Sequence, residues 1–203
     1  MTKSLLFTIL CLSIVFSGCA KKSPLRMLEP EDTVLCFGDS ITFGLGAALP
    51  DQSYPSVLET IIQRQVVNGG VPGEQTSEGL ERLREWLNRD QPALVILCEG
   101  GNDMLRHVDE RIIVDQLRKM IHMAKSRGAD VVLIGVPHPG LLLRDASFYS
   151  KLAREEDVPY AKQILSRILS DPLLRSDQIH PNEKGYQMLA KSVAELLREQ
   201  GAV

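Results

Sequence analysis

A serine and a histidine that could act as a nucleophile and its base stand near opposite ends of this 203-residue chain. Ser40 follows a short apolar run in Gly38-Asp39-Ser40, and His180 comes three positions after Asp177. A serine hydroxyl is a weak nucleophile until a base takes its proton, and a neutral histidine suits that role near pH 7. A carboxylate can fix the tautomer of the imidazole and stabilise its charged form. This combination of residue types predicts acyl transfer at Ser40.

Acyl transfer also requires hydrogen-bond donors for the negatively charged oxygen of the tetrahedral intermediate. The candidates are the backbone N–H groups of Ser40 and Gly73 and the side-chain amide of Asn102. A glycine at position 73 would let the backbone approach the substrate where a Cβ would intrude. Each residue also has a plain structural explanation, since Ser40 or Asp177 could cap a helix and Gly73 or Asn102 could serve only in turns. The prediction of a site therefore depends on their occurrence together.

Alternating strand-like and helix-like segments must position these residues. Apolar runs without polar alternation predict buried strands, and apolar stripes at helical spacing predict the helices between them. The expected strands cover 33–37, 66–67, 93–98, 131–136 and 158–161. The expected helices cover 54–65, 76–89, a segment capped by Asp109 that stops at Gly128, a segment around 148–152, and a long final helix that begins at Pro181.

This order predicts one three-layer α/β domain, in which helices cover both faces of a parallel sheet. In such sheets, ligands bind at the carboxyl ends of the strands. Glycines and small polar residues follow three successive expected strands, at 38–44, 68–74 and 100–103. We expect these segments to meet at one edge, beside the loop that carries Asp177 and His180.

Four sequence blocks together resemble the GDSL esterases, the SGNH hydrolase family, and specifically its bacterial lysophospholipase, thioesterase and arylesterase branch. The blocks are Gly-Asp-Ser at 38–40, Val-Pro-Gly-Glu-Gln-Thr at 71–76, Gly-Gly-Asn-Asp at 100–103 and Asp-x-x-His-Pro at 177–181. The resemblance extends from about Thr33 to the final helix. Each block alone is weakly or moderately specific, whereas all four in this order are a strong signal.

The resemblance implies a flavodoxin-like α/β/α sandwich with about five strands and a serine esterase that uses no metal and no organic cofactor. Pro72 and Glu74 differ from the small residue and the Asp that are common in the second block, which could reshape that loop while leaving the glycine N–H available. The implied catalytic triad is Ser40, Asp177 and His180, and the implied oxyanion hole is Ser40, Gly73 and Asn102.

Other functions on similar folds fit the sequence less well. Gly44-Leu45-Gly46 lacks the third glycine of a dinucleotide-binding loop, because Leu49 stands at that position. No Walker loop is present, and Gly38-Asp39-Ser40-Ile41-Thr42 lacks the closing glycine of an α/β-hydrolase elbow. A non-catalytic lipoprotein that only binds a ligand remains an alternative, although every catalytic residue type is present.

The first nineteen residues resemble a bacterial export signal that ends in a lipoprotein box. Lys3 precedes an apolar core at 5–16, and Phe16-Ser17-Gly18-Cys19 supplies the box, with Phe16 at a position that is usually Leu. We expect a signal peptide at 1–18, a lipid on Cys19, a flexible tether through 32 and the hydrolase domain at 33–203. An uncleaved anchor or a plain secretory signal is the alternative. The expected location is the periplasmic or cell-surface side of a membrane.

Composition limits the partners. A net charge of −3 provides no broad positive field for nucleic acid. The spacing of the cysteines and histidines matches no metal site, so we expect no bound metal, and no obligate protein partner is evident. Cys36 and Cys98 lie within apolar runs and are expected to be packed in the core.

The substrate is expected to be a small-molecule or lipid ester or thioester. His107, His138 and Leu141 lie in loops that should border the site, so we consider them possible substrate contacts. Fold does not choose among lysophospholipids, acyl thioesters and aryl esters. An O-acetyl esterase that acts on cell-wall or other polysaccharide is the alternative.

Overall fold

The computed structural model describes residues 25–140 and 143–203. Five parallel strands form one sheet in the order β2-β1-β3-β4-β5, which confirms the predicted α/β class and strand number. The strands are β1 (Thr33–Gly38), β2 (Gln65–Gly70), β3 (Leu94–Cys98), β4 (Asp130–Ile134) and β5 (Tyr160–Ala161).

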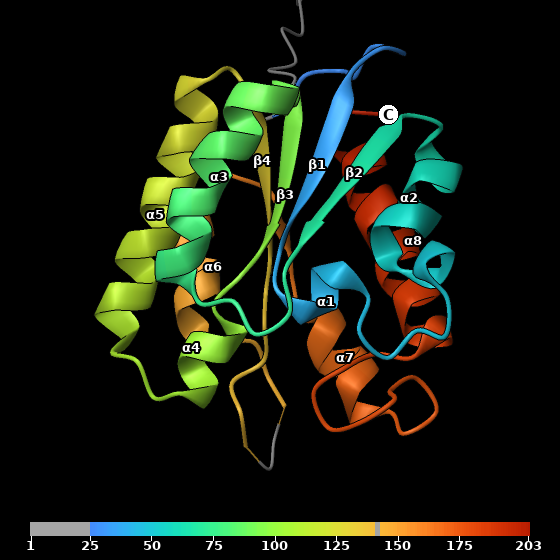
Figure 1. Ribbon diagram of the computed structural model, residues 1–203, viewed down its shortest axis with the longest axis vertical. Coiled ribbons are helices and arrows are strands. Elements are labelled where there is room, and N and C mark those ends of the chain that lie inside the picture. Colours follow the sequence, from blue (N-terminus) through green and yellow to red (C-terminus); the bar gives the residue numbers. More distant parts are fainter. Residues whose placement is uncertain (1–24, 141–142) are drawn as a thin grey trace, which may run out of the picture.

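Helices cover both faces of this sheet (Figure 1). One face carries α3 (Thr76–Asp90), α5 (Glu110–Ser126) and α6 (Ser147–Glu155), and the other carries α2 (Tyr54–Ile62), α7 (Ile164–Ser170) and α8 (Glu183–Glu199). Three shorter helices lie in loops, namely α1 (Ser40–Phe43), η1 (Pro50–Gln52) and α4 (Gly101–Leu105). The result is the predicted three-layer arrangement.

The continuous apolar runs of β1 and β3 are explained by their central positions. Every residue from Val34 to Phe37 and from Ile96 to Cys98 has no exposed surface, because helices pack on both faces of these strands. Cys36 and Cys98 are buried free thiols within this core. Residue types that alternate between the two faces would be unfavourable here, since neither face meets water.

Some predicted boundaries are wrong. The final helix begins at Glu183 rather than at Pro181, because the side chain of Asn182 caps it by accepting from the Gly185 N–H at 3.1 Å. The last strand is limited to Tyr160–Ala161, where it pairs with β4. Helix α7 was not predicted from the sequence.

The predicted tether from Cys19 to residue 32 is too long. Leu25 and Leu28 are 5% and 2% exposed and belong to the hydrophobic core. The Leu28 N–H donates to the Ala202 carbonyl at 2.8 Å, and the Arg26 N–H donates to the Asp130 carboxylate at the same distance. The folded domain therefore includes residues from Leu25 onward. Residues 1–24, including the proposed signal and Cys19, lie outside the described part of the chain.

The order of the strands determines where a site can form. The connection from β1 to β2 passes through α2 on one face, and the connection from β2 to β3 passes through α3 on the other. Ligand sites in doubly wound sheets form outside the carboxyl ends of the strands where the direction reverses. Here that place lies between β1 and β3, whose ends lead directly into α1 and α4.

Candidate active site

The structure brings Ser40, His180 and Asp177 together. The Ser40 Oγ lies 2.9 Å from the His180 Nε2, and the His180 Nδ1 lies 2.7 Å from the Asp177 Oδ2. Ser40 and His180 are 8% and 9% exposed, so the reacting pair is largely shielded from water. With the Nδ1 proton directed to the carboxylate, the Nε2 can accept the proton of the serine.

Asp177 is held by the loop that it shares with His180. Its Oδ1 accepts the backbone N–H groups of Ile179 and His180, both at 2.8 Å, while its Oδ2 faces the imidazole. Partial burial raises the pKa of Asp177, but the hydrogen bonds from the His180 ring and from the two backbone N–H groups outweigh this, and its pKa is lowered. The carboxylate therefore stays ionised beside the imidazole. Asp177 does not cap the final helix.

Ser40 stands at the junction of β1 and α1. Asp39, rather than Ser40, caps this helix by accepting from the Ile41 N–H at 2.9 Å. The hydroxyl of Ser40 is thereby free to face His180, and its N–H belongs to the first helical turn, where backbone donors lack intrahelical partners. Burial raises the pKa of Asp39 to about 6, although the Ile41 N–H and the nearby His180 act to lower it.

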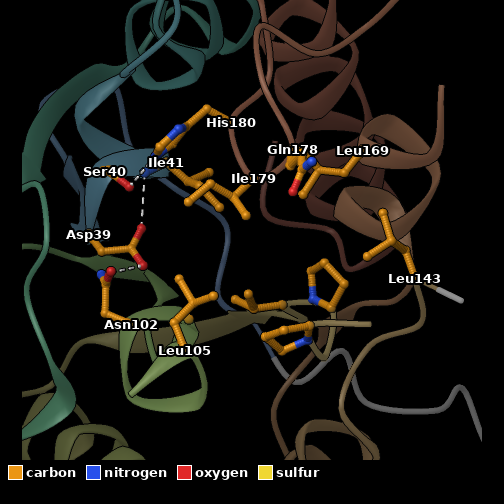
Figure 2. Close-up of a pocket in the computed structure, with 14 residues that line it drawn as sticks. Asp39, Ser40, Ile41, Asn102, Leu105, Leu143, Leu169, Gln178, Ile179 and His180 are labelled. Atoms are coloured by element: carbon orange, nitrogen blue, oxygen red, sulfur yellow. Dashed lines mark hydrogen bonds between the residues drawn. The ribbon is translucent and has the colours of Figure 1, made fainter. Parts of the chain in front are cut away.

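Asn102 lies on α4, directly after β3. Its Nδ2 donates to the Glu74 carbonyl at 2.9 Å. It also donates to the Asp39 Oδ2 at 3.3 Å (Figure 2). Gly100 adopts a φ of +102° before this helix, and a Cβ there would come within 2.7 Å of the Tyr149 hydroxyl. Asn102 thus connects the loops after β1, β2 and β3.

Gly73 lies in the exposed loop after β2 but does not line the pocket beside Ser40. A Cβ at this position would meet no protein atom within 4 Å, whereas its φ of +80° is strained for other residues. Position 73 therefore requires glycine because of its positive φ. A Cβ there would crowd no part of the protein, so the predicted crowding applies only to a bound substrate. The neighbouring Glu74 carbonyl brings this loop into contact with Asn102.

A buried group of charged residues supports the same loop. The guanidinium of Arg82 on α3 donates to both carboxylate oxygens of Glu74 and lies 4.1 Å from the centre of the Phe37 ring. Glu99, at the end of β3, is fully buried and accepts from the Gly100 N–H at 3.2 Å. Burial raises the pKa of Glu99 well above its ordinary value, and the neighbouring Asp39 and Glu74 raise it further. Burial therefore favours the neutral form of the Glu99 carboxyl over its charged form.

Sequence reasoning found only part of this group. It identified Glu74 as a departure from the Asp that is common at this position. Asp103 accepts from the N–H and the hydroxyl of Thr76, at 2.9 and 2.7 Å. The role of Arg82 was missed, because one arginine on an amphipathic helix gives no signal that it pairs inward. The ionisable Glu99 directly after an apolar strand was the available clue.

An apolar pocket extends from Ser40 and His180 between the loops (Figure 2). Gln178 and Asn102 add polar groups to its rim. The apolar residues that line it are Ile41, Leu105, Val136, Pro137, Pro139, Leu143, Leu169 and Ile179. Ile41 lies in a segment that the sequence placed at this edge, and Leu143 belongs to the same run as Leu141. The other residues were not predicted, because they come from segments far apart in the chain.

The three possible substrate contacts have different outcomes. His107 and His138 are exposed, and neither lines the pocket. His138 lies between Pro137 and Pro139, which do line it, and its ring faces the Pro139 carbonyl at 2.9 Å. Leu141 lies outside the described residues.

Within residues 25–140 and 143–203, no cluster of three or more His, Cys, Asp or Glu residues could hold a metal ion. In the same part of the chain, no helix is both long enough and apolar enough to cross a membrane.

A serine, a histidine and a carboxylate in hydrogen-bonded sequence at the carboxyl edge of a parallel sheet define a serine hydrolase. The family model described as the GDSL-like lipase/acylhydrolase family matches residues 36–188, and the chain belongs to this family. It is accordingly an enzyme that hydrolyses ester bonds of small-molecule substrates.

Known relatives agree with this assignment. The chain is 30% identical over 197 residues to an arylesterase of Vibrio mimicus, covering 92% of this chain and 96% of that protein. It is also 30% identical to the thioesterase 1/protease 1/lysophospholipase L1 of Escherichia coli K12, covering 82% of this chain and 84% of that protein. The crystal structure of TesA superimposes with a TM-score of 0.75 at 27% identity, covering 83% of this chain and 99% of that one. The fold is therefore the SGNH hydrolase fold.

Proposed function

We propose that the protein hydrolyses carboxylic esters or thioesters with an aliphatic acyl chain, through an acyl-serine intermediate on Ser40. The observation that carries this proposal is the chain of contacts from the Ser40 Oγ through His180 to Asp177, at 2.9 and 2.7 Å. These distances lie within the range expected for a nucleophile and its general base. The relatives named arylesterase and thioesterase support the same reaction class.

The first half of the reaction forms the acyl-enzyme. The Ser40 Oγ attacks the carbonyl carbon while the His180 Nε2 takes its proton, and the charged imidazole is stabilised by Asp177. The oxygen of the tetrahedral intermediate accepts hydrogen bonds from the Ser40 N–H, the Gly73 N–H and the Asn102 amide. The longer bond of Asn102, to Asp39 at 3.3 Å, is the one that this oxygen would replace. His180 then returns the proton to the leaving alcohol or thiol as its bond to carbon breaks.

The second half repeats the chemistry with water. His180 takes a proton from water as the oxygen attacks the acyl carbon, and the same donors hold the second tetrahedral intermediate. Collapse of this intermediate breaks the bond to Ser40, which recovers its proton from His180, and releases the acid. Each proton is accounted for by His180, so the cycle requires no metal.

Replacement of the nucleophile is the direct test. Ser40→Ala should abolish turnover of p-nitrophenyl esters while leaving the melting temperature within a few degrees of wild type. Ser150→Ala is a matched control, because this hydroxyl on α6 bonds only to the Ser147 carbonyl at 3.0 Å, and it should keep full activity. Near-normal turnover by Ser40→Ala would contradict the proposal, and a non-catalytic ligand-binding protein would follow if wild type itself were inactive.

The oxyanion role of Asn102 can be tested separately. Asn102→Ala should lower kcat by roughly 10²- to 10³-fold, the usual cost of losing one oxyanion donor. KM should change little, because the oxygen carries its negative charge only in the transition state. A stopped-flow or steady-state assay with p-nitrophenyl butyrate gives both constants. An unchanged kcat would remove Asn102 from the mechanism.

The apolar pocket favours an aliphatic acyl chain over an acetyl group. Its lining of leucine, valine, proline and isoleucine side chains offers contacts that an acetate would leave unused. A series of p-nitrophenyl esters from acetate to palmitate, with a lysophospholipid, an acyl thioester and an acetylated sugar, should show kcat/KM rising beyond acetate. Activity on acetyl groups alone would instead favour the O-acetyl esterase.

We further propose that the protein is exported and anchored to a membrane through a lipid on Cys19. The support is the sequence pattern of Lys3, the apolar run at 5–16 and the Phe16-Ser17-Gly18-Cys19 box. Expression with a labelled fatty acid should label the wild-type chain, and Cys19→Ser should remove both the label and the membrane association. Labelling that persists in Cys19→Ser would contradict this proposal.

A further inference from the structure

The pocket beside Ser40 opens into a larger groove. The two spaces adjoin, because both are lined by Leu105, Pro139, Leu143, Gln178 and Ile179. The cavity at Ser40 has a volume of about 60 Å³, whereas the groove has about 630 Å³, within the usual range for small-molecule sites. A substrate larger than a short ester would therefore extend from the pocket into this groove.

Two arginines line the groove beyond the apolar pocket, Arg144 before α6 and Arg175 in the loop after α7. Arg144 is exposed and Arg175 is half-buried, with its Nη1 donating to the Leu169 carbonyl at 2.9 Å. Among the ion pairs of the described residues, none includes either arginine. Two positive charges thus lie beside a groove that leads to the nucleophile.

Neighbouring carboxylates are engaged elsewhere. Asp145 follows Arg144 in the chain, but its oxygens accept from the hydroxyls of Tyr160 and Ser166, each at 2.6 Å, and from the Gln163 N–H. Asp171 accepts from the Leu173 N–H at 2.9 Å. The arginines therefore keep donors available for a group that the chain itself does not supply.

The charges at the two ends of this path have opposite signs. Asp39 lines the pocket beside Ser40, whereas Arg144 and Arg175 line the groove and not this pocket. A negatively charged group on a substrate is repelled near Asp39 and attracted at the arginines. This arrangement favours one orientation, with an ester carbonyl at Ser40 and an anionic group at the far end.

We infer that Arg144 and Arg175 bind an anionic group of the substrate, a carboxylate or a phosphate, joined to the reacting ester through an aliphatic segment that fills the apolar pocket. The inference rests on the proposed ester hydrolysis at Ser40. Arginine suits this role because its planar donors match carboxylate and phosphate oxygens. The anion can belong either to the acyl part, as a terminal carboxylate, or to the alcohol part, as a phosphate.

Two matched pairs of esters separate these sources. In the first pair, the p-nitrophenyl monoester of adipic acid differs from p-nitrophenyl hexanoate only by the terminal carboxylate. In the second pair, 1-butyrylglycerol 3-phosphate differs from 1-butyrylglycerol only by the phosphate. The ratio of kcat/KM, charged over neutral, is measured for each pair. In the pair whose anion is placed as in the natural substrate, this ratio should fall as the NaCl concentration is raised, because salt screens the charges of the arginines.

The variants are Arg144→Gln, Arg175→Gln and the double variant. Arg167→Gln is the control, because it removes the same charge from a residue that is exposed on α7 and lies outside the groove. The double variant should lower the charged-to-neutral ratio about tenfold in at least one pair, and Arg144→Gln about threefold, consistent with the loss of charge-assisted hydrogen bonds. Arg167→Gln should leave the ratio unchanged.

The outcomes are distinguishable. If Arg175→Gln unfolds, Arg144→Gln still decides, since no hydrogen bond or ion pair of its side chain is described. Wild-type turnover of the neutral esters with a charged-to-neutral ratio that no variant alters would overturn this inference and leave the proposed function intact. Failure of wild type to hydrolyse any of the four esters would overturn both.

Discussion

Ser40 is supported on two sides, and the two sides are built differently. On the side of the base, Asp177 and His180 are three residues apart in one loop, and the Asp177 side chain is 54% exposed. On the side of the oxyanion hole, Asn102, Glu74 and Arg82 come from separate elements, and the side chains of Glu74 and Arg82 are only 5% and 20% exposed. The side of the base is formed within one loop and has an exposed carboxylate. The side of the oxyanion hole is formed by residues far apart in the chain, and its ion pair is buried.

This difference implies that the side of the base serves mainly catalysis, whereas the buried side also stabilises the folded protein. An exposed carboxylate in a loop contributes little to stability, so Asp177 serves the chemistry of His180. A buried ion pair becomes costly when one partner is lost, because the other charge remains without compensation. Changes on the base side should therefore alter rate with little effect on folding, whereas changes on the buried side should alter folding as well.

The largest expected effect is on the base side. Asp177→Asn should lower kcat about 10³-fold, or about 4 kcal/mol, because an amide beside the Nδ1 favours the tautomer whose Nε2 cannot accept the serine proton. The Asn carbonyl can still accept the two backbone N–H groups, so the melting temperature should stay close to wild type. Steady-state kinetics and thermal unfolding monitored by circular dichroism measure the two effects. If Asp177→Asn lowered the free energy of unfolding by as much as it raised the activation free energy, the proposed difference between the two sides would be wrong.

The next effect is on the buried side. Arg82→Ala should lower the free energy of unfolding by about 3 kcal/mol, because the buried Glu74 would lose its ion-pair partner. Arg89→Ala is the matched control on the same helix, since Arg89 also pairs with an acid, Asp90, and lies 4.0 Å from an aromatic ring, that of Trp86. Arg89 is 61% exposed, so its loss should lower the free energy of unfolding much less than the loss of Arg82. Urea unfolding of both variants compares them, and equal costs would show that burial is not the cause.

The smallest effect is a change in the pH dependence of stability. Because the pKa of Glu99 is raised in the folded state, the folded protein holds a proton that the unfolded chain releases as pH rises above the ordinary Glu range. The stability of wild type should therefore fall as pH increases, by at most about 1.4 kcal/mol per pH unit from this residue. Asp39, with its pKa raised to about 6, adds a fall of the same sign below that pH.

Glu99→Gln should remove the contribution of Glu99, because the amide has no proton to lose and can donate to Glu74. The difference in unfolding free energy between Glu99→Gln and wild type should shift in favour of the variant between pH 5 and pH 8, measured by urea unfolding at each pH. Asp39 is present in both proteins and cancels. A difference that does not vary with pH would mean that Glu99 is ionised in the folded state.

The same difference explains which parts of the fold and of the site could be predicted from the sequence. Asp177 and His180 are neighbours in the chain, so their spacing alone indicated the contact that the structure contains. The positions of the two central strands followed from the apolar runs at 33–37 and 93–98, because strands that are buried on both faces leave a clear pattern. Local patterns of this kind survive in the sequence because each depends on residues that lie close together.

The long-range features could not be found in the same way. The pairing of Arg82 with Glu74 depends on how α3 rests on the sheet, and the apolar wall of the pocket combines Leu105, Val136 and Leu169 from three segments. Leu25 and Leu28 were assigned to a tether because polar and proline residues surround them. Their burial depends on contacts with the last residues of the chain, which no local pattern records.

The position of Leu25 and Leu28 has a consequence for the orientation of the enzyme. The backbone of Arg26 is hydrogen-bonded to Asp130, the first residue of β4, and that of Leu28 is hydrogen-bonded to Ala202. Ser40, in contrast, stands two residues after the end of β1. The chain thus enters the fold at the amino ends of the strands, and β1 alone spans roughly 20 Å to the catalytic edge. Only residues 20–24 separate Cys19 from Leu25, a reach of at most about 20 Å. The proposed lipid on Cys19 would therefore attach the protein to a bilayer through the edge of the sheet that lies opposite Ser40.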